Sequence, residues 1–211
     1  MRTEDLIRAL GADTRSLSEP MAQRFLTLAF VGALAAACLF ALILTPRPDL
    51  SIVIGTPRVA FKFLFALTLV GAAGALAFKT THPEARPSLW SVLVPVLALL
   101  ATGIAAELVA SSPAAWGRLL IGSNALACVT LVPLLSLLPL SAILAAMRHG
   151  APSRPRLAGA VAGLLAGGIG AAVYAVHCPD DSPLFVAAWY GVSIAAVATL
   201  GTVLGARLLR W

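Results

Sequence analysis

The chain has 211 residues, of which 60% are hydrophobic and only 11% are charged, and its mean hydropathy is +0.94. A soluble domain carries about 25% charged residues, so this composition excludes an ordinary water-soluble fold and indicates that lipid is the main solvent of the chain. The formal net charge of +6 would suit nucleic acid, but the Lys and Arg residues are dispersed among connecting segments and form no stripe, so we expect no direct nucleic-acid partner and interpret them as topology signals.

Residues 1–24 form a polar head before the first apolar run. Thr3 and Gly11 are placed to begin and end a short helix. Such a helix is too short to be stable alone, so its apolar face needs the membrane surface or a partner protein. Acidic residues in its first turn favour the protein partner over lipid adhesion. The residues expected on the apolar face are Leu6, Ile7 and Leu10.

Six uninterrupted apolar runs follow the head, each about 20 residues long and bounded by Pro, charged or turn residues. Backbone polar groups in lipid must be bonded within their own segment, and these runs are too long and too unalternating for barrel strands. We therefore predict an all-α, polytopic membrane protein with a bundle over 25–208 and a tail at 209–211. The predicted transmembrane helices are Phe25–Leu44, Val59–Phe78, Trp90–Ala110, Ala125–Met147, Leu157–His177 and Leu184–Leu208.

The start of the fourth run is ambiguous, because apolar character already begins at Leu119. The polar triplet Gly122, Ser123 and Asn124 forms a break with an N-cap, so the helix is placed from Ala125 onward.

Small residues are dense in the fifth run, where Gly159, Gly163 and Gly167 recur every four residues and Gly170 falls off that pattern. Glycines at this spacing share one stripe of a helix and allow a neighbouring helix to approach closely. We expect helix packing at this stripe, and not a ligand channel.

The distribution of basic residues predicts the orientation of the bundle. Connections on the side of the N-terminus carry eleven Lys and Arg residues, and those on the other side carry four. The positive-inside rule therefore places both termini in the cytoplasm and three connections outside. The four basic residues expected outside are Arg47, Arg58, Lys62 and Arg118.

Ionisable residues are nearly absent from the predicted spans, which argues against a pump, transporter or membrane enzyme. Glu107 is the only carboxylate within a span and lies about one turn from its outer end, where we expect it to be paired or to reach the interface. Lys62 is interpreted in the same way. The chain has no HExxH, GxSxG, Walker-type or CxxC motif, so we expect no enzymatic activity and no resident cofactor.

Two of the three cysteines are expected at the outer end of the bundle. Cys38 lies in the middle of the first span, where a thiol is a small apolar packing residue. Cys128 falls in the first turn of the fourth span, and Cys178 follows the fifth. The two thiols thus reach one membrane depth on the oxidising side, and the helix N-terminus would favour a reactive thiolate at Cys128.

The run from His177 to Pro183 gathers an imidazole, a thiol and two carboxylates in one short connection. His177, Cys178 and Cys128 together would suit a borderline or soft metal such as zinc or cadmium, bound transiently. Their irregular spacing leaves a second interpretation open, in which Cys128 and Cys178 are simply two buried thiols.

The chain resembles the NrsF-type membrane anti-sigma factors along essentially its whole length. The resemblance is carried by the head from Thr3 to Asp13, the six spans, Cys128, and the segment of His177, Cys178 and Pro179 followed by Ser182, Phe185, Trp189 and Tyr190. It implies that the head sequesters an extracytoplasmic-function (ECF) sigma factor at the bacterial inner membrane. The sigma-binding residues it implies are Asp5, Leu6, Ile7, Leu10 and Asp13.

The resemblance also implies that Cys128 and Cys178 sense a heavy metal or an oxidant and that the bundle then releases the sigma factor. Two other functions compete with this prediction. A small six-helix transporter or metal-efflux protein would share the outer Cys and His residues, but not the dearth of charge in the spans. A membrane oxidoreductase would use the thiol pair, but the CxxC arrangement is missing. The sequence indicates no oligomeric state.

Overall fold

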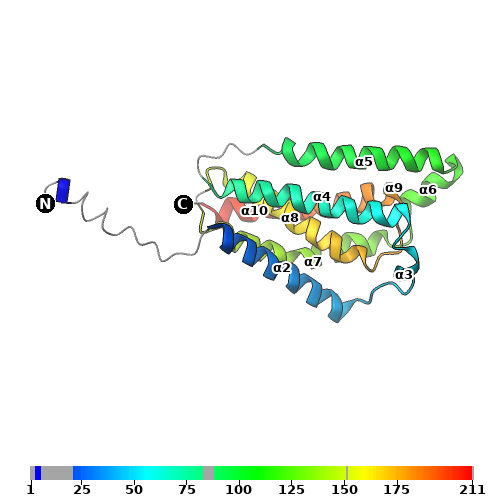
Figure 1. The fold of residues 1–211 in the computed structure, drawn as a ribbon, viewed down its shortest axis with the longest axis horizontal. Coiled ribbons are helices and arrows are strands. Elements are labelled where there is room, and N and C mark those ends of the chain that lie inside the picture. The colour runs from blue at the N-terminus through cyan, green and yellow to red at the C-terminus, as the bar shows by residue number, and fades with distance from the viewer. Residues whose placement is uncertain (1–2, 6–20, 83–87, 151, 211) are drawn as a thin grey trace.

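The structure is a computed structural model that describes residues 3–5, 21–82, 88–150 and 152–210. Within these ranges the secondary structure is helical and contains no strand. Six helices are long and apolar enough to cross a membrane, and they lie alongside one another in a bundle (Figure 1). The predicted all-α architecture with six membrane-spanning helices is therefore confirmed.

The observed spans match the predicted ones to within a few residues. Three of them begin at a proline that the prediction had placed outside the helix, because proline is favoured at the first helical position, where no intrahelical N–H bond is lost. The six spans are α2 (Met21–Ile43), α4 (Pro57–Thr80), α5 (Trp90–Ala110), α7 (Ala125–Met147), α8 (Pro155–Ala175), and a composite of α9 (Pro183–Phe185), the π-helical turn η1 (Val186–Tyr190) and α10 (Gly191–Leu208).

The described parts of the connections contain two short helices that the sequence did not predict. They are α3 (Leu50–Val53) and α6 (Pro113–Ile121). The apolar character that begins at Leu119 belongs to α6, and Gly122, with a φ of 61°, ends that helix in a conformation that suits glycine.

The two ends of the bundle differ. The start of α2 and the end of α10 lie together at what we call the terminal end, whereas α3, α6 and α9 lie at the opposite, distal end (Figure 1). Helix α8 is central, because it packs against α2, α4, α7 and α10 and is the most buried span. Helix α5 is peripheral and packs mainly on α4.

The glycine stripe on α8 is a helix-packing surface, as predicted. A Cβ added at Gly159 would overlap the carbonyl oxygen of Gly201, and one added at Gly163 would lie 2.6 Å from the Ala198 Cα. Gly170 faces away from α10, toward Ser136 on α7. The backbones of α8 and α10 are thus in direct contact, which brings two adjacent helices together without large side chains between them.

We predict that Gly159→Ala destabilises the bundle by about 2 kcal/mol, because the added methyl must push α8 and α10 apart. The matched control is Gly71→Ala on α4, where an added Cβ meets no atom within 4 Å. Reversible unfolding of the purified chain in mixed detergent micelles measures both changes. Equal stability of the two variants would contradict the packing argument.

Candidate functional site

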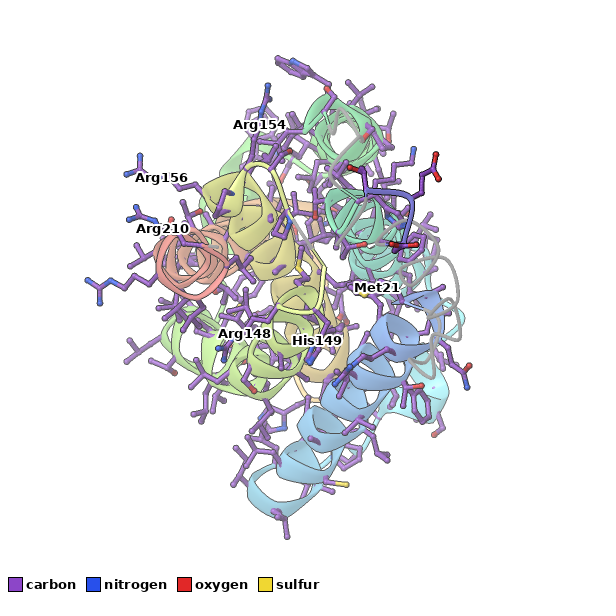
Figure 2. The ribbon with its side chains drawn as sticks, turned by 90° about the vertical axis from the view of Figure 1, so that its left-hand side faces the viewer. Met21, Arg148, His149, Arg154, Arg156 and Arg210 are labelled. Atoms are coloured by element: carbon purple, nitrogen blue, oxygen red, sulfur yellow. The ribbon has the colours of Figure 1, made fainter. Side chains whose placement is uncertain are left out.

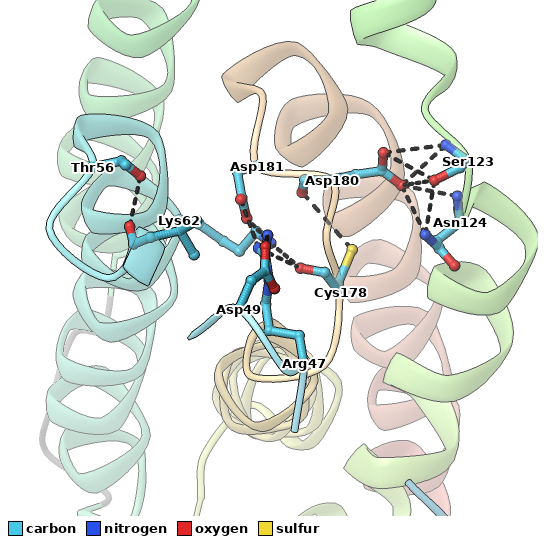
Figure 3. A network of polar contacts seen from close by, with 10 residues as sticks. Arg47, Asp49, Thr56, Lys62, Ser123, Asn124, Cys178, Asp180 and Asp181 are labelled. Atoms are coloured by element: carbon cyan, nitrogen blue, oxygen red, sulfur yellow. Dashed lines mark hydrogen bonds and ion pairs between the residues drawn. The ribbon is translucent and has the colours of Figure 1, made fainter. Parts of the chain in front are cut away.

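The connection between α8 and α9, residues 176–182, is the centre of the distal end, and we call it the distal loop. It receives hydrogen bonds and ion pairs from several elements that are far apart in the sequence (Figure 3). The sequence analysis placed a candidate site on this segment, and the structure shows what its side chains contact.

Lys62 on α4 is fully buried and points at the distal loop. Its Nζ donates to the Cys178 carbonyl oxygen at 2.8 Å and lies 2.5 Å from Asp181 Oδ1. Lys62 was expected to be paired or to reach the interface, and the structure shows the paired alternative. The ammonium is held inside the protein, because a carboxylate and a carbonyl there replace the water it loses.

Arg47 supplies a second cation to the same carboxylate. Its Nη1 donates to Asp181 Oδ2 at 2.7 Å, and its Nε donates to Asp49 Oδ1 at 2.7 Å. The hydrogen bond to Asp49, reinforced by Asp181, raises the pKa of the Arg47 guanidinium, and the same bond lowers the pKa of Asp49. Asp181 therefore joins the segment after α2 to α4.

Asp180, the neighbouring carboxylate, caps the N-terminus of α7. Its Oδ2 accepts the backbone N–H of Asn124 at 2.8 Å and that of Ser123 at 3.0 Å (Figure 3). The sequence analysis expected this cap from the local triplet, but the side chain of Asn124 makes no cap bond to the helix. A carboxylate from a distant segment takes the role, which suits the positive end of the helix dipole.

Three further hydrogen bonds tie the distal end together. His177 Nδ1 lies 2.7 Å from the Thr45 carbonyl oxygen, and the backbone N–H of Arg47 donates to the Val176 carbonyl oxygen at 3.1 Å. Trp189 Nε1 donates to the Leu120 carbonyl oxygen of α6 at 2.9 Å. The distal loop and the helix that follows it are therefore connected to the segments around α2, α4, α6 and α7.

Cys128 and Cys178 lie at the distal end, as predicted, but both are free and fully buried. The Cys128 Sγ is 3.9 Å from Ser193 Oγ, and the Cys178 Sγ is 3.8 Å from the Asp180 carbonyl oxygen. Burial raises the pKa of the Cys178 thiol. The sequence analysis favoured a reactive thiolate at Cys128, but the Cys128 side chain is covered by protein here, so the alternative of two buried thiols describes this conformation.

The metal hypothesis gains no support from this geometry. No group of three His, Cys, Asp or Glu side chains that could hold a metal ion occurs in the part of the chain that the structure describes. His177, one of the three suggested ligands, is half-buried, and its Nδ1 is within hydrogen-bond distance of the Thr45 carbonyl oxygen. Cys38 is also unlike its prediction, because it is exposed on the outside of α2 and does not pack inside the bundle.

Two tyrosines beside the thiols escaped the sequence analysis as site residues. Tyr174 and Tyr190 are fully buried, and their ring centroids are 6.0 Å apart. Neither hydroxyl has a hydrogen-bond partner among the described residues. Tyr190 ends the π-helical turn Val186–Tyr190, a local irregularity of the kind often found at functional sites.

Glu107 is paired, as expected for a carboxylate in a span. Arg58 donates to its two oxygens at 2.6 and 3.0 Å, and the Glu107 side chain is only 4% exposed. This bidentate pair joins α4 to the peripheral α5.

The predicted sigma-binding head is described only in part. Residues 3–5 are helical and exposed, and Asp5 is among them. The other four head residues of that prediction, Leu6, Ile7, Leu10 and Asp13, lie outside the described residues.

The fold and the site together define a membrane-spanning helical bundle with a polar, densely bonded distal end. Residues 10–211 match the family model described as "Negative regulator of sigma F", NrsF, so the chain belongs to this family. A probable anti-sigma-F factor of Azospira oryzae is 34% identical, and an anti-sigma-F factor of Caulobacter vibrioides is 36% identical, each over the full length of both chains. These relatives are regulators by name and not enzymes. No solved structure matches the chain.

We predict that Asp181→Asn lowers the free energy of unfolding by about 3 kcal/mol or more, because it leaves the ammonium of Lys62 buried without a counter-charge. Unfolding of the purified full chain in detergent measures the loss. Asp49→Asn is the matched control, since it removes the same charge from a side chain that is 47% exposed and leaves the Arg47–Asp181 pair in place. A loss as large in the control would assign the effect to general charge balance.

We also predict that a water-soluble maleimide modifies Cys178 in the folded protein more slowly, by on the order of tenfold or more, than after denaturation in SDS, since the thiol is covered and resists ionisation. An introduced cysteine at Arg118, which is exposed on α6, provides the accessible control. Mass spectrometry of the labelled chain measures both rates. Rapid labelling of Cys178 in the folded chain would show that the distal loop opens readily.

Proposed function

We propose that this protein is a membrane anti-sigma factor that holds an ECF sigma factor at the bacterial inner membrane and thereby keeps it from RNA polymerase. The observation that carries the proposal is full-length similarity to two anti-sigma-F factors, at 34% and 36% identity.

The charge distribution supports a cytoplasmic terminal end. Segments that lead to this end carry eleven basic and five acidic residues, whereas distal segments carry four of each, so the whole formal charge of +6 belongs to the terminal end. Three of the four distal cations, Arg47, Arg58 and Lys62, are also in ion pairs. The positive-inside rule then places the N-terminal head in the cytoplasm, where a sigma factor is found.

The head, residues 1–24, is the sigma-binding element in this proposal. Its apolar residues Leu6, Ile7 and Leu10 would enter a groove of the sigma factor as one face of a short helix. Asp5, which is exposed, and Asp13 would contact polar or basic groups beside that groove.

Cys128 and Cys178 are the signal-sensing residues in this proposal. A heavy-metal ion would displace the two thiol protons, and an oxidant would accept two electrons and two protons as a disulfide forms. Either reaction requires the buried thiols to approach one another. Because Cys178 is joined through its carbonyl to Lys62, this movement would disturb the ion pairs that hold the distal loop.

Helix α4 provides a physical connection from the distal loop to the head. It carries Lys62 near its distal end and Phe78 near its terminal end. The Phe78 ring lies 5.9 Å from the ring of Phe25, which is in the first turns of α2, directly after the head. A shift of α4 at Lys62 would therefore also move Phe78 and change its contact with Phe25, next to the head. In this proposal α4 has two positions, one in the sigma-bound state and one in the sigma-free state.

The described residues provide no observation that favours the competing transporter function. Glu107 is the one carboxylate within the spans, and Arg58 already pairs with it. A transport pathway would need polar groups along the length of the bundle, whereas the described ion pairs lie in its distal part.

We predict that the double substitution Leu6→Asp and Leu10→Asp releases the sigma factor and raises expression of its target genes without a signal. A charge placed in an apolar groove is strongly unfavourable, so sigma binding should fall at least 100-fold. Co-purification of the sigma factor with membranes and a transcriptional reporter measure the effect.

The matched control is Arg8→Asp, which places a carboxylate on the other side of the same expected helix and should retain repression. Membrane abundance of each variant must equal that of the unmodified chain, which separates loss of binding from loss of protein. Continued repression by the double variant would eliminate the head as the binding element.

A further inference from the structure

Four arginine side chains and one histidine side chain lie around the C-terminus of α10 at the terminal end (Figure 2). Arg148 and His149 follow α7, Arg154 and Arg156 flank the start of α8, and Arg210 follows α10. All five side chains are exposed. They come from three helices that pack against one another, so the bundle itself holds them together.

Two pockets lie among these side chains and share Arg210. The first, between the ends of α7 and α10, has a volume of about 380 Å³ and is lined by Ala145, Arg148, His149, Leu208 and Arg210. The Nδ1 of His149 lies 2.9 Å from the Ala145 carbonyl oxygen. Because a carbonyl can only accept, Nδ1 carries a proton and donates it, and the Nε2 side of the ring is left for another partner.

The second pocket, at the start of α8, has a volume of about 310 Å³ and is lined by Arg154, Pro155, Arg156, Ala206 and Arg210. The first turn of α8 adds the positive end of a helix dipole to its two arginines. Arg210 thus stands between two concave, positively charged sites on neighbouring faces of α10.

The arginines of the two pockets lack protein counter-charges in the described ranges. All ion pairs that the structure shows there involve Arg47, Arg58 or Lys62, and no carboxylate lines either pocket. Several guanidinium groups brought together in this way repel one another, and an anion between them would relieve the repulsion.

We propose that these two pockets bind the phosphate groups of an anionic phospholipid. The pockets lie at the ends of spanning helices, the depth at which lipid headgroups meet the protein, and basic pockets between such helices suit phosphate-bearing headgroups. Ala145, Leu208 and Ala206 form apolar walls against which the glycerol and the first acyl carbons can lie. Two adjacent pockets suit a lipid with two phosphates best, so diphosphatidylglycerol should bind more tightly than phosphatidylglycerol.

This inference goes beyond the proposed function and does not depend on it, because headgroup phosphates are present at both membrane surfaces. The test uses the purified full chain in a neutral maltoside detergent. The temperature of half-unfolding is measured with added phosphatidylcholine, phosphatidylglycerol, diphosphatidylglycerol or inorganic phosphate. We expect a rise of about 5 °C with diphosphatidylglycerol, a smaller rise with phosphatidylglycerol, and none with the other two.

The variant Arg148→Gln with Arg210→Gln should lose this rise while keeping the lipid-free unfolding temperature. The matched control Arg118→Gln removes an exposed cation from the distal end and should keep the rise. If the double variant does not fold, Arg210→Gln alone gives the same comparison, because Arg210 lines both pockets.

Four outcomes would overturn the proposal. Equal stabilisation by phosphatidylcholine would indicate a general lipid effect, and equal stabilisation by inorganic phosphate would indicate a free-phosphate site. An equal loss in the Arg118→Gln control would indicate charge alone. Loss of sigma-factor binding by the double variant in lipid-free detergent, with no lipid effect in the unmodified chain, would assign the surface to a protein contact.

Discussion

The buried ammonium of Lys62 is the constraint on which the distal end depends. Its side chain is fully buried, so the distal loop must supply the Cys178 carbonyl and the Asp181 carboxylate at close range. Asp181 is held in turn by Arg47, which fixes the segment after α2. Displacing the loop would strand one or two charges in a low-dielectric interior, so the loop has one strongly preferred position.

Charge also separates the two ends of the molecule. Distal cations are matched by equal numbers of carboxylates and are largely paired, which makes that end a rigid, nearly neutral cover. The excess of positive charge belongs to the other end, where the guanidinium groups around Arg210 find no carboxylate among the described residues. The charges of the distal end are thus largely balanced within the chain, whereas the positive charges of the terminal end are suited to anionic partners outside it.

The sequence predicted what depends on local pattern. The length of the apolar runs predicted the six spans, and the break before Ala125 predicted the start of the fourth. The four-residue spacing of Gly159 and Gly163 predicted a close helix contact, but not that its partner is α10. What the local pattern did not predict depends on partners distant in the chain. Lys62 is buried because residues 116 and 119 positions later accept its charge, and α7 is capped by Asp180, so neither fact is visible in the local sequence.

The two thiols show why the candidate site required a structure. The positions of Cys128 and Cys178 in the sequence predicted that both lie at the same end of the bundle, but not that both are buried. Asp180 connects the two residues through hydrogen bonds. Its carbonyl accepts from Cys178 Sγ, its carboxylate caps Asn124, and the Asn124 carbonyl accepts the backbone N–H of Cys128. Pulling either sulfur out of place would strain the same short chain of hydrogen bonds. A sensor built on these cysteines would therefore act through the cap of α7 as well as through the ion pair of Lys62.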